Sequence, residues 1–122
     1  MRRLDIARKA RRDIDHLLWE SRQLHGPRAA ERYQRLISLA FTDLCSDPRR
    51  PRSKPGEIGD LRLYALRAPA RRLKGADRVN APPHVIAYRF DDDRVIILRL
   101  LHEAMDLPDH LRRAARIEDG EA

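Results

Sequence analysis

Cysteine is almost missing from this 122-residue chain, in which Cys45 stands alone. A lone cysteine cannot form an intramolecular disulfide, which excludes the small secreted proteins whose folds depend on such bridges. Long apolar runs are missing too, and no stretch approaches the roughly 20 residues that a membrane-spanning helix needs. The first residues are rich in arginine and lack the apolar core of a signal peptide. We therefore expect a cytoplasmic protein that makes no contact with a membrane.

Glycine is also scarce, and the five glycines stand apart from one another. A nucleotide-binding loop needs clustered glycines so that its backbone can approach phosphate groups, so nucleotide cofactors are not indicated. His102, Asp106 and His110 have the spacing of metal ligands on one face of a helix. Pro108 lies among them, however, and argues against a continuous helix there. We expect no cofactor and no metal.

Charged residues are abundant by contrast, and positive charge is in excess. They make up 37% of the chain, while hydrophobic residues make up 42% and recur periodically. This balance favours a single folded domain over residues 1–122 with a heavily charged surface, rather than a disordered chain. The formal net charge of +7 predicts an acidic partner, which is either nucleic acid or an acidic protein segment.

The first half of the chain predicts a strand and a helical hairpin. Apolar and charged residues alternate over residues 2–6, which favours a short strand at a sheet edge. Helical spacing begins at Ala10, and the Gly26-Pro27 pair ends the first helix and starts the second. An Asp-Pro pair ends that second helix. Its buried face is predicted to consist of Ala29, Tyr33, Leu36, Ile37, Ala40, Phe41 and Leu44.

The second half predicts loops, a strand and a final hairpin. Residues 49–58 are polar and proline-rich, and residues 68–83 form a second basic stretch, so we expect both to be mobile without a partner. A strand starts after Gly59 between these two stretches. Two apolar strands, over residues 84–90 and 94–101, are joined by three aspartates. The second of these has an uninterrupted apolar run, which predicts a place in the middle of the sheet.

Together these elements predict an α+β fold. We expect the N-terminal strand and the helical hairpin to pack on a small, mostly antiparallel sheet of about four strands. A tail over residues 103–122 carries a short C-terminal helix. Pro108 places the start of this helix at about Leu107, with Asp106 as the N-cap whose side chain accepts backbone amides.

Three motifs stand out in the last third of the chain. They are HVIAYR at residues 84–89, ILRLLH at residues 97–102, and the pairs Met105-Asp106 and His110-Leu111. This pattern resembles the ParE branch of the RelE/ParE superfamily, toxins of bacterial type II toxin–antitoxin modules that include plasmid stabilization proteins. Residues 68–83 depart from the family pattern, which has a tighter turn at this point.

The resemblance implies a RelE/ParE-like fold and a growth-inhibiting toxin without chemistry of its own. Such a toxin binds DNA gyrase, with the A subunit as the expected partner, and traps its cleaved-DNA state. A cognate antitoxin with an acidic, initially disordered C-terminal segment neutralises it. Direct DNA binding is not expected of this chain, because the antitoxin of such modules usually carries the DNA-binding fold.

We expect target contacts on the final strands and the tail. Arg89 and Arg99 interrupt apolar strands, so each either pairs with a carboxylate or serves binding. Met105 is alternatively a core plug under the tail, and His102 a hydrogen-bonded residue at a strand end. The full set of target-binding candidates is Arg89, Arg99, His102, Met105, Asp106, His110 and Leu111.

Antitoxin contacts are expected elsewhere, on the basic segments and at the first strand. Residues 49–78 hold ten basic and three acidic residues, a field that suits an acidic segment which folds on binding. The edge strand near Leu4 could accept an added strand. A solvated loop with no specific partner is the plain alternative for the basic segments. The remaining antitoxin-binding candidates are Arg49, Arg50, Arg62, Arg67, Arg71, Arg72 and Lys74.

Two other functions remain open on the same fold. Toxins of the RelE branch cleave messenger RNA on the ribosome, which needs a base at the 2′-hydroxyl and cations at the phosphate. Val85 and Met105-Asp106 stand where such enzymes carry arginines, which disfavours this activity. The residues that would serve a nuclease are His102, His110, Arg62 and Arg99. The third alternative is a non-toxic or decayed binding protein.

Overall fold

The structure is a computed structural model that describes residues 1–117. The end of the predicted tail, residues 118–122, lies outside the described residues. Along the chain the elements are β1 (Arg3–Ile6), α1 (Arg8–His25), α2 (Pro27–Ser46), β2 (Lys54–Pro55), β3 (Arg62–Ala65), α3 (Arg67–Ala70), a 3-10 turn (Gly75–Asp77), β4 (His84–Phe90), β5 (Arg94–His102) and α4 (Leu107–Ala114). Within residues 1–117, no helix combines the length and apolarity needed to cross a membrane.

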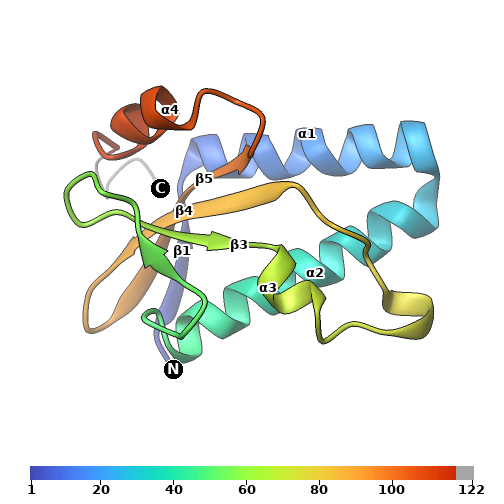
Figure 1. Cartoon of the computed structure of the whole chain (residues 1–122), viewed down its shortest axis with the longest axis horizontal. Helices are drawn as coiled ribbons and strands as arrows, with labels where there is room; N and C mark the ends of the chain where they lie inside the picture. Colours follow the sequence, from blue (N-terminus) through green and yellow to red (C-terminus); the bar gives the residue numbers. More distant parts are fainter. Residues whose placement is uncertain (118–122) are drawn as a thin grey trace.

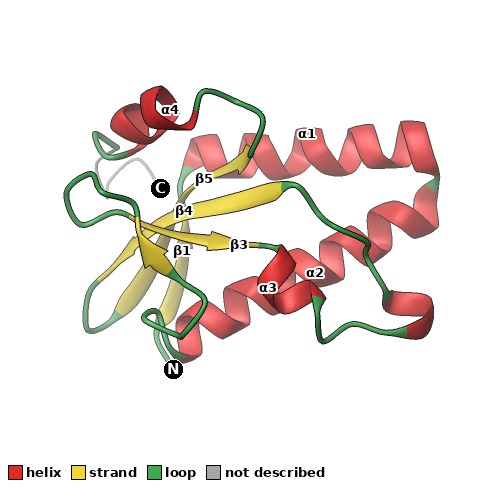
Figure 2. Ribbon diagram, in the orientation of Figure 1, coloured by secondary structure: helices red, strands yellow, loops and turns green. Residues whose placement is uncertain are grey.

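The five strands form one sheet in the order β1-β5-β4-β3-β2 (Figure 2). β1 runs parallel to β5, with Arg3 opposite Arg94 and Ile6 opposite Ile97, and the other neighbouring strands are antiparallel. The predicted positions of β1 at an edge and of β5 inside the sheet are therefore confirmed. The α+β class with a mostly antiparallel sheet is confirmed as well.

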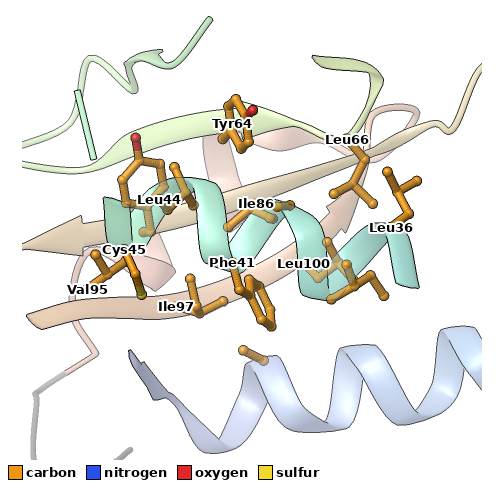
Figure 3. Close-up of a cluster of buried hydrophobic side chains, with 14 of the residues drawn as sticks. Leu36, Phe41, Leu44, Cys45, Tyr64, Leu66, Ile86, Val95, Ile97 and Leu100 are labelled. Atoms are coloured by element: carbon orange, nitrogen blue, oxygen red, sulfur yellow. The ribbon is translucent and has the colours of Figure 1, made fainter. Parts of the chain in front are cut away.

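The helical hairpin of α1 and α2 covers one face of the sheet, and its tip extends beyond the strands (Figure 1). Leu36 and Leu44 of α2 are fully buried against Ile86 of β4 and against Ile97 and Leu100 of β5 (Figure 3). Removing such a side chain from water stabilises the fold by about 1.5–3 kcal/mol. The predicted apolar face of the second helix is thus the main core, although Ala30 rather than Ala29 is its first buried residue.

A second, smaller core lies on the opposite face of the sheet. There Leu111 and Ala114 of α4, followed by Ile117, belong to one buried cluster with Ile96 and Leu98 of β5. α4 therefore provides the second cover that makes β5 buried on both faces. A strand with this environment needs apolar residues at successive positions rather than alternating ones, which explains the run from Val95 to Leu98.

Three short elements are present where the sequence predicted only loops. The loop predicted over residues 49–58 contains β2, which pairs with β3 and makes the sheet one strand larger than expected. The stretch predicted over residues 68–83 begins inside α3 and includes the 3-10 turn. These elements span two, four and three residues. Such lengths are too short to produce a hydrophobic period that a sequence could reveal.

Candidate functional site

The loop between β5 and α4, residues 103–106, is exposed to solvent. His102 ends β5, and its Nδ1 accepts a hydrogen bond of 3.0 Å from the amide of Ala104. The amide of Met105 donates to the carbonyl of His102, also at 3.0 Å. His102 is thus a hydrogen-bonded residue at a strand end, which is the alternative to a target contact that the sequence offered.

Met105 is 38% exposed, so the alternative that it plugs the core under the tail is wrong. The space under the tail is filled by α4, whose Leu111 is only 6% exposed. Leu111, one of the target-binding candidates, therefore has a core position. Met105 is an apolar side chain presented to solvent from a short, hydrogen-bonded loop.

The start of α4 at Leu107 is confirmed, and Asp106 is its N-cap residue. The capping hydrogen bond expected from the Asp106 side chain is not formed. Its backbone ψ of 84° departs from the extended geometry that usually brings a capping oxygen over the first amides of a helix. Asp106 instead bonds to the helix through its backbone carbonyl, which accepts a hydrogen bond of 3.2 Å from the amide of His110. The exposed Asp106 carboxylate and Met105 thus lie side by side in the chain.

Arg89 lies beneath the tail rather than on the open surface. Its guanidinium donates to the carbonyls of Ala115, at 3.1 Å, and Ile117, at 2.9 Å, at the end of α4. A cation at a helix C-terminus is favoured by the unpaired carbonyls there and by the helix dipole. Arg89 therefore positions the tail on the sheet. His110 of α4 is partly buried, and its Nδ1 is a buried atom without a hydrogen-bond partner among residues 1–117.

Arg99 pairs with Asp13 of α1, so the ion-pair alternative holds for this residue. The distances from its Nε and one terminal nitrogen to the two carboxylate oxygens are 2.7 and 3.0 Å. Both side chains are mostly shielded from solvent, with 16% and 17% exposed. The charge of Arg99 is therefore compensated inside the protein.

A histidine pair that the sequence analysis did not single out lies at the end of the β4–β5 ladder. His84 is opposite His102, and the two ring centroids are 5.2 Å apart. Nδ1 of His84 shares a hydrogen bond of 2.7 Å with the Tyr33 hydroxyl. Burial lowers the pKa of His84 to about 4, and the charge of His102 acts in the same direction while Asp13 opposes it. The sequence signal available was a histidine opening one strand while another histidine closed its hairpin partner.

The four residues considered for a nuclease do not form a common site. Arg62 donates to the Ser53 hydroxyl at 2.8 Å, and Arg99 is held by Asp13. Across residues 1–117, no hydrogen bond or ion pair joins any two of the four. The geometry thus provides no paired acid and base beside a free cation from this set.

Several antitoxin-binding candidates are held by the protein's own carboxylates. Asp43 of α2 is 5% exposed, and it forms ion pairs with Arg72 and, at 3.3 Å, with Arg50. It also accepts a hydrogen bond of 2.9 Å from the Tyr64 hydroxyl. Burial and this hydrogen bond raise the pKa of Tyr64 to about 12. Elsewhere, Arg67 pairs with Glu103.

Other candidates remain open to a partner. Arg71 and Lys74 line a pocket of about 880 Å³ beside α3. The Arg49 guanidinium lies over the Phe90 ring, 5.0 Å from its centroid. Leu4 is 37% exposed on β1, a strand at the edge of the sheet. The structure thus separates the basic candidates into those that stabilise the fold and those that face solvent.

The fold now described is that of a small α+β protein of the RelE/ParE type, with a helical hairpin on one face and a short terminal helix on the other. Residues 4–107 match the family of the ParE toxin of the type II toxin-antitoxin system, parDE, and the chain belongs to this family. It is therefore the toxin component of a type II toxin–antitoxin module. The match includes the exposed loop with Met105 and ends where α4 begins.

A comparison with solved structures supports the fold. The chain is similar to a chain of the chromosomal ParDE TA system from P. aeruginosa, with a TM-score of 0.64 and 20% sequence identity. The similarity covers 84% of this chain and 96% of the other. A search among curated proteins found no match.

Proposed function

We propose that this toxin inhibits DNA gyrase in the cytoplasm through protein–protein contact, without catalysis, and that a cognate antitoxin neutralises it. Membership of the ParE family supports this function. The single observation that carries the proposal to a site is the exposure of Met105 within the matched region. An exposed apolar side chain on a short loop that follows a buried strand is a suitable anchor for a protein partner.

Rigidity of the surroundings makes this anchor effective. The loop 103–106 follows β5, which is buried between two layers of helices, and precedes α4, which Arg89 ties to the sheet. A side chain presented by such a support loses little freedom when it binds, so more of its contact energy remains as affinity. Met105 itself can adapt its shape to an apolar pocket on the partner.

Charge brings the toxin to its partner in this proposal. The net charge of +7 attracts the chain to a protein–DNA complex, whose phosphates are negative. This attraction raises the rate of encounter and falls with added salt. The contact at Met105 would then provide specificity that charge alone does not give.

The proposal is tested by adding purified toxin to gyrase and plasmid DNA and measuring the accumulation of cleaved DNA. We expect accumulation with the natural chain and a loss of about tenfold or more in potency with Met105→Ala. Leu24→Ala is the matched control, because Leu24 is an exposed apolar side chain on α1. Messenger RNA cleavage on translating ribosomes, with gyrase unaffected, would instead identify a nuclease.

The antitoxin half of the proposal has a separate test. Expression of the toxin alone should stop growth, and co-expression with the product of a neighbouring small gene with an acidic C-terminal half should restore it. The basic surface around α3 supports an acidic partner of this kind. Harmless expression of the folded toxin alone would contradict the toxic function and favour the decayed-protein alternative.

A further inference from the structure

The pocket beside α3 has a lining of one charge sign. Its basic residues are Arg52, Arg67, Arg71, Lys74 and Arg78, and within residues 1–117 neither aspartate nor glutamate lines it. Apolar residues complete the lining, and Ala65, Leu73 and Val79 are among them. The volume of about 880 Å³ is sufficient for several side chains of a partner.

Most of these cations have no partner within the protein. Arg67 pairs with Glu103, but Arg52, Arg71, Lys74 and Arg78 form no ion pair or hydrogen bond through their side chains within residues 1–117. Four like charges around one concave surface repel one another, and an anionic ligand relieves that repulsion. The chemistry of the pocket therefore selects a negatively charged ligand.

The segment that forms the pocket is fixed to the rest of the fold on both sides. Arg72 forms an ion pair with the buried Asp43, and Asp77 in the 3-10 turn pairs with Arg35 of α2. Arg72 is the only basic residue from 71 to 74 in the sequence that is absent from the pocket lining. The anchored residue holds the segment, while its neighbours Arg71 and Lys74 face the pocket.

The pocket adjoins a free part of the sheet edge. β2 pairs only with Arg62 and Leu63 of β3, so in the described part of the chain the outer side of β3 has no strand partner at Ala65. The carbonyl of Leu61 accepts the amide of Gly56 on the β2 side of β3. Alternate residues of a strand direct their backbone groups to the same side, so those of Ala65 also face this side, where β2 has ended. Ala65 is itself a lining residue. An extended peptide in the pocket could therefore pair with β3.

We propose that this pocket binds an extended acidic peptide segment, whose carboxylates contact Arg71, Lys74 and Arg78 and whose backbone adds to the outer edge of β3. In the cell this segment belongs to the neutralising antitoxin, so the assignment rests on the proposed function. A single-stranded nucleic acid fits less well, because none of the described lining residues is an aromatic on which bases could stack. The apolar lining residues suit the alternate side chains of a peptide strand.

The experiment measures binding of a fluorescent synthetic peptide, in which glutamate alternates with valine, to the full-length toxin by anisotropy. Arg71→Glu with Lys74→Glu should weaken binding by about tenfold or more. Arg12→Glu with Arg22→Glu is the matched control, because it makes the same change in charge at exposed residues of α1, outside both the pocket lining and β1. Circular dichroism establishes that both double variants are folded.

The outcomes separate this inference from the proposed function. Selective loss of peptide binding in the Arg71/Lys74 variant, with gyrase-dependent DNA cleavage retained, supports the pocket. An equal loss of peptide binding in both double variants means that net charge alone determines binding, and it overturns the proposed binding site. No binding of the peptide to the natural toxin also overturns the site, whereas the gyrase assay still tests the proposed function. If a single-stranded DNA of equal charge binds the pocket more tightly than the peptide does, the ligand is a nucleic acid and the assignment to a peptide is overturned.

Discussion

Asp13 of α1 and Arg99 of β5 form a two-point ion pair that joins the helical hairpin to the sheet. The same carboxylate accepts the backbone amide of Leu100 at 3.0 Å. β1 pairs with β5 only as far as Ile97, so beyond that residue no strand of the described chain pairs with this edge of β5. Asp13 satisfies the amide that a longer β1 would have bonded.

This arrangement predicts that Asp13→Ala destabilises the protein by about 2 kcal/mol. The substitution leaves a largely shielded guanidinium and a backbone amide without their acceptor. The free energy of unfolding, measured with urea, provides the test. Asp15→Ala on the exposed side of α1 is the control and should change stability by less than about 0.5 kcal/mol. Equal effects of the two substitutions would show that the ion pair has no structural role.

Replacement of Asp43 should lower the stability of the protein more than replacement of Asp13 does. Asp43→Ala removes the acceptor of the buried Tyr64 hydroxyl and releases Arg72, so we expect a loss of about 3 kcal/mol. Thermal and urea unfolding should both report it. The neighbouring exposed Thr42→Ala is the control in the same helix. Unchanged stability in Asp43→Ala would mean that the released arginines find new acceptors or solvent without cost.

The lowered pKa of His84 predicts that the free energy of unfolding falls in mild acid. Its pKa is lowered to about 4 in the folded protein from an ordinary value of 6.5, so the unfolded chain takes up the proton first as pH falls. The stabilisation is present above about pH 6.5 and is lost as the pH falls through about 4. With partial exposure reducing the effect, we expect a loss of about 1–2 kcal/mol over this range.

The measurement is urea unfolding across that range for the natural chain and for His84→Gln. The glutamine variant should lose less stability on acidification, because residue 84 no longer titrates. His16→Gln removes an exposed histidine of α1 and should retain the natural pH dependence. Parallel pH profiles for all three proteins would refute the role of His84.

Replacement of Arg89 should loosen the tail without loosening the main core, because its guanidinium donates to tail carbonyls. Arg89→Met removes the donor to the carbonyls of Ala115 and Ile117, so α4 should open more often while the main core stays intact. Hydrogen exchange of the α4 amides should rise by about tenfold or more, with little change in α2. Arg112→Met, an exposed change within α4, is the control. Uniform exchange changes across the chain would contradict a specific anchoring of the tail.

Local patterns in the sequence predict the long elements well. α2 shows a helical period because one of its faces packs on the sheet, and β5 shows a continuous apolar run because helices cover both of its faces. The same reasoning misses β2 and α3, whose lengths of two and four residues contain less than one informative repeat. Their positions depend on pairing and packing with distant segments.

The site was less predictable, since charged residues acquire their roles from distant partners. The partner of Arg99 is Asp13 in α1, and the partner of Arg72 is Asp43 in α2. Nothing in the local sequence distinguishes Arg72, which anchors a segment, from Arg71, which faces the pocket. Exposure of Met105 likewise depends on how α4 fills the core beneath it.

The pairing of β1 with β5 joins the first strand of the sheet to a strand that is synthesised after the other four. β1 and the helical hairpin leave the ribosome first, whereas the strand between β1 and β4 is made near the end. Pairing between such distant segments forms slowly, because a long loop must close before contacts compensate for its lost entropy. A translation product that stops within β4 lacks β5, the strand that joins β1 to the rest of the sheet, and the loop that carries Met105. Under the proposed function, a chain interrupted within β4 lacks the anchor for its target, and only chains that extend beyond β5 can bind that target.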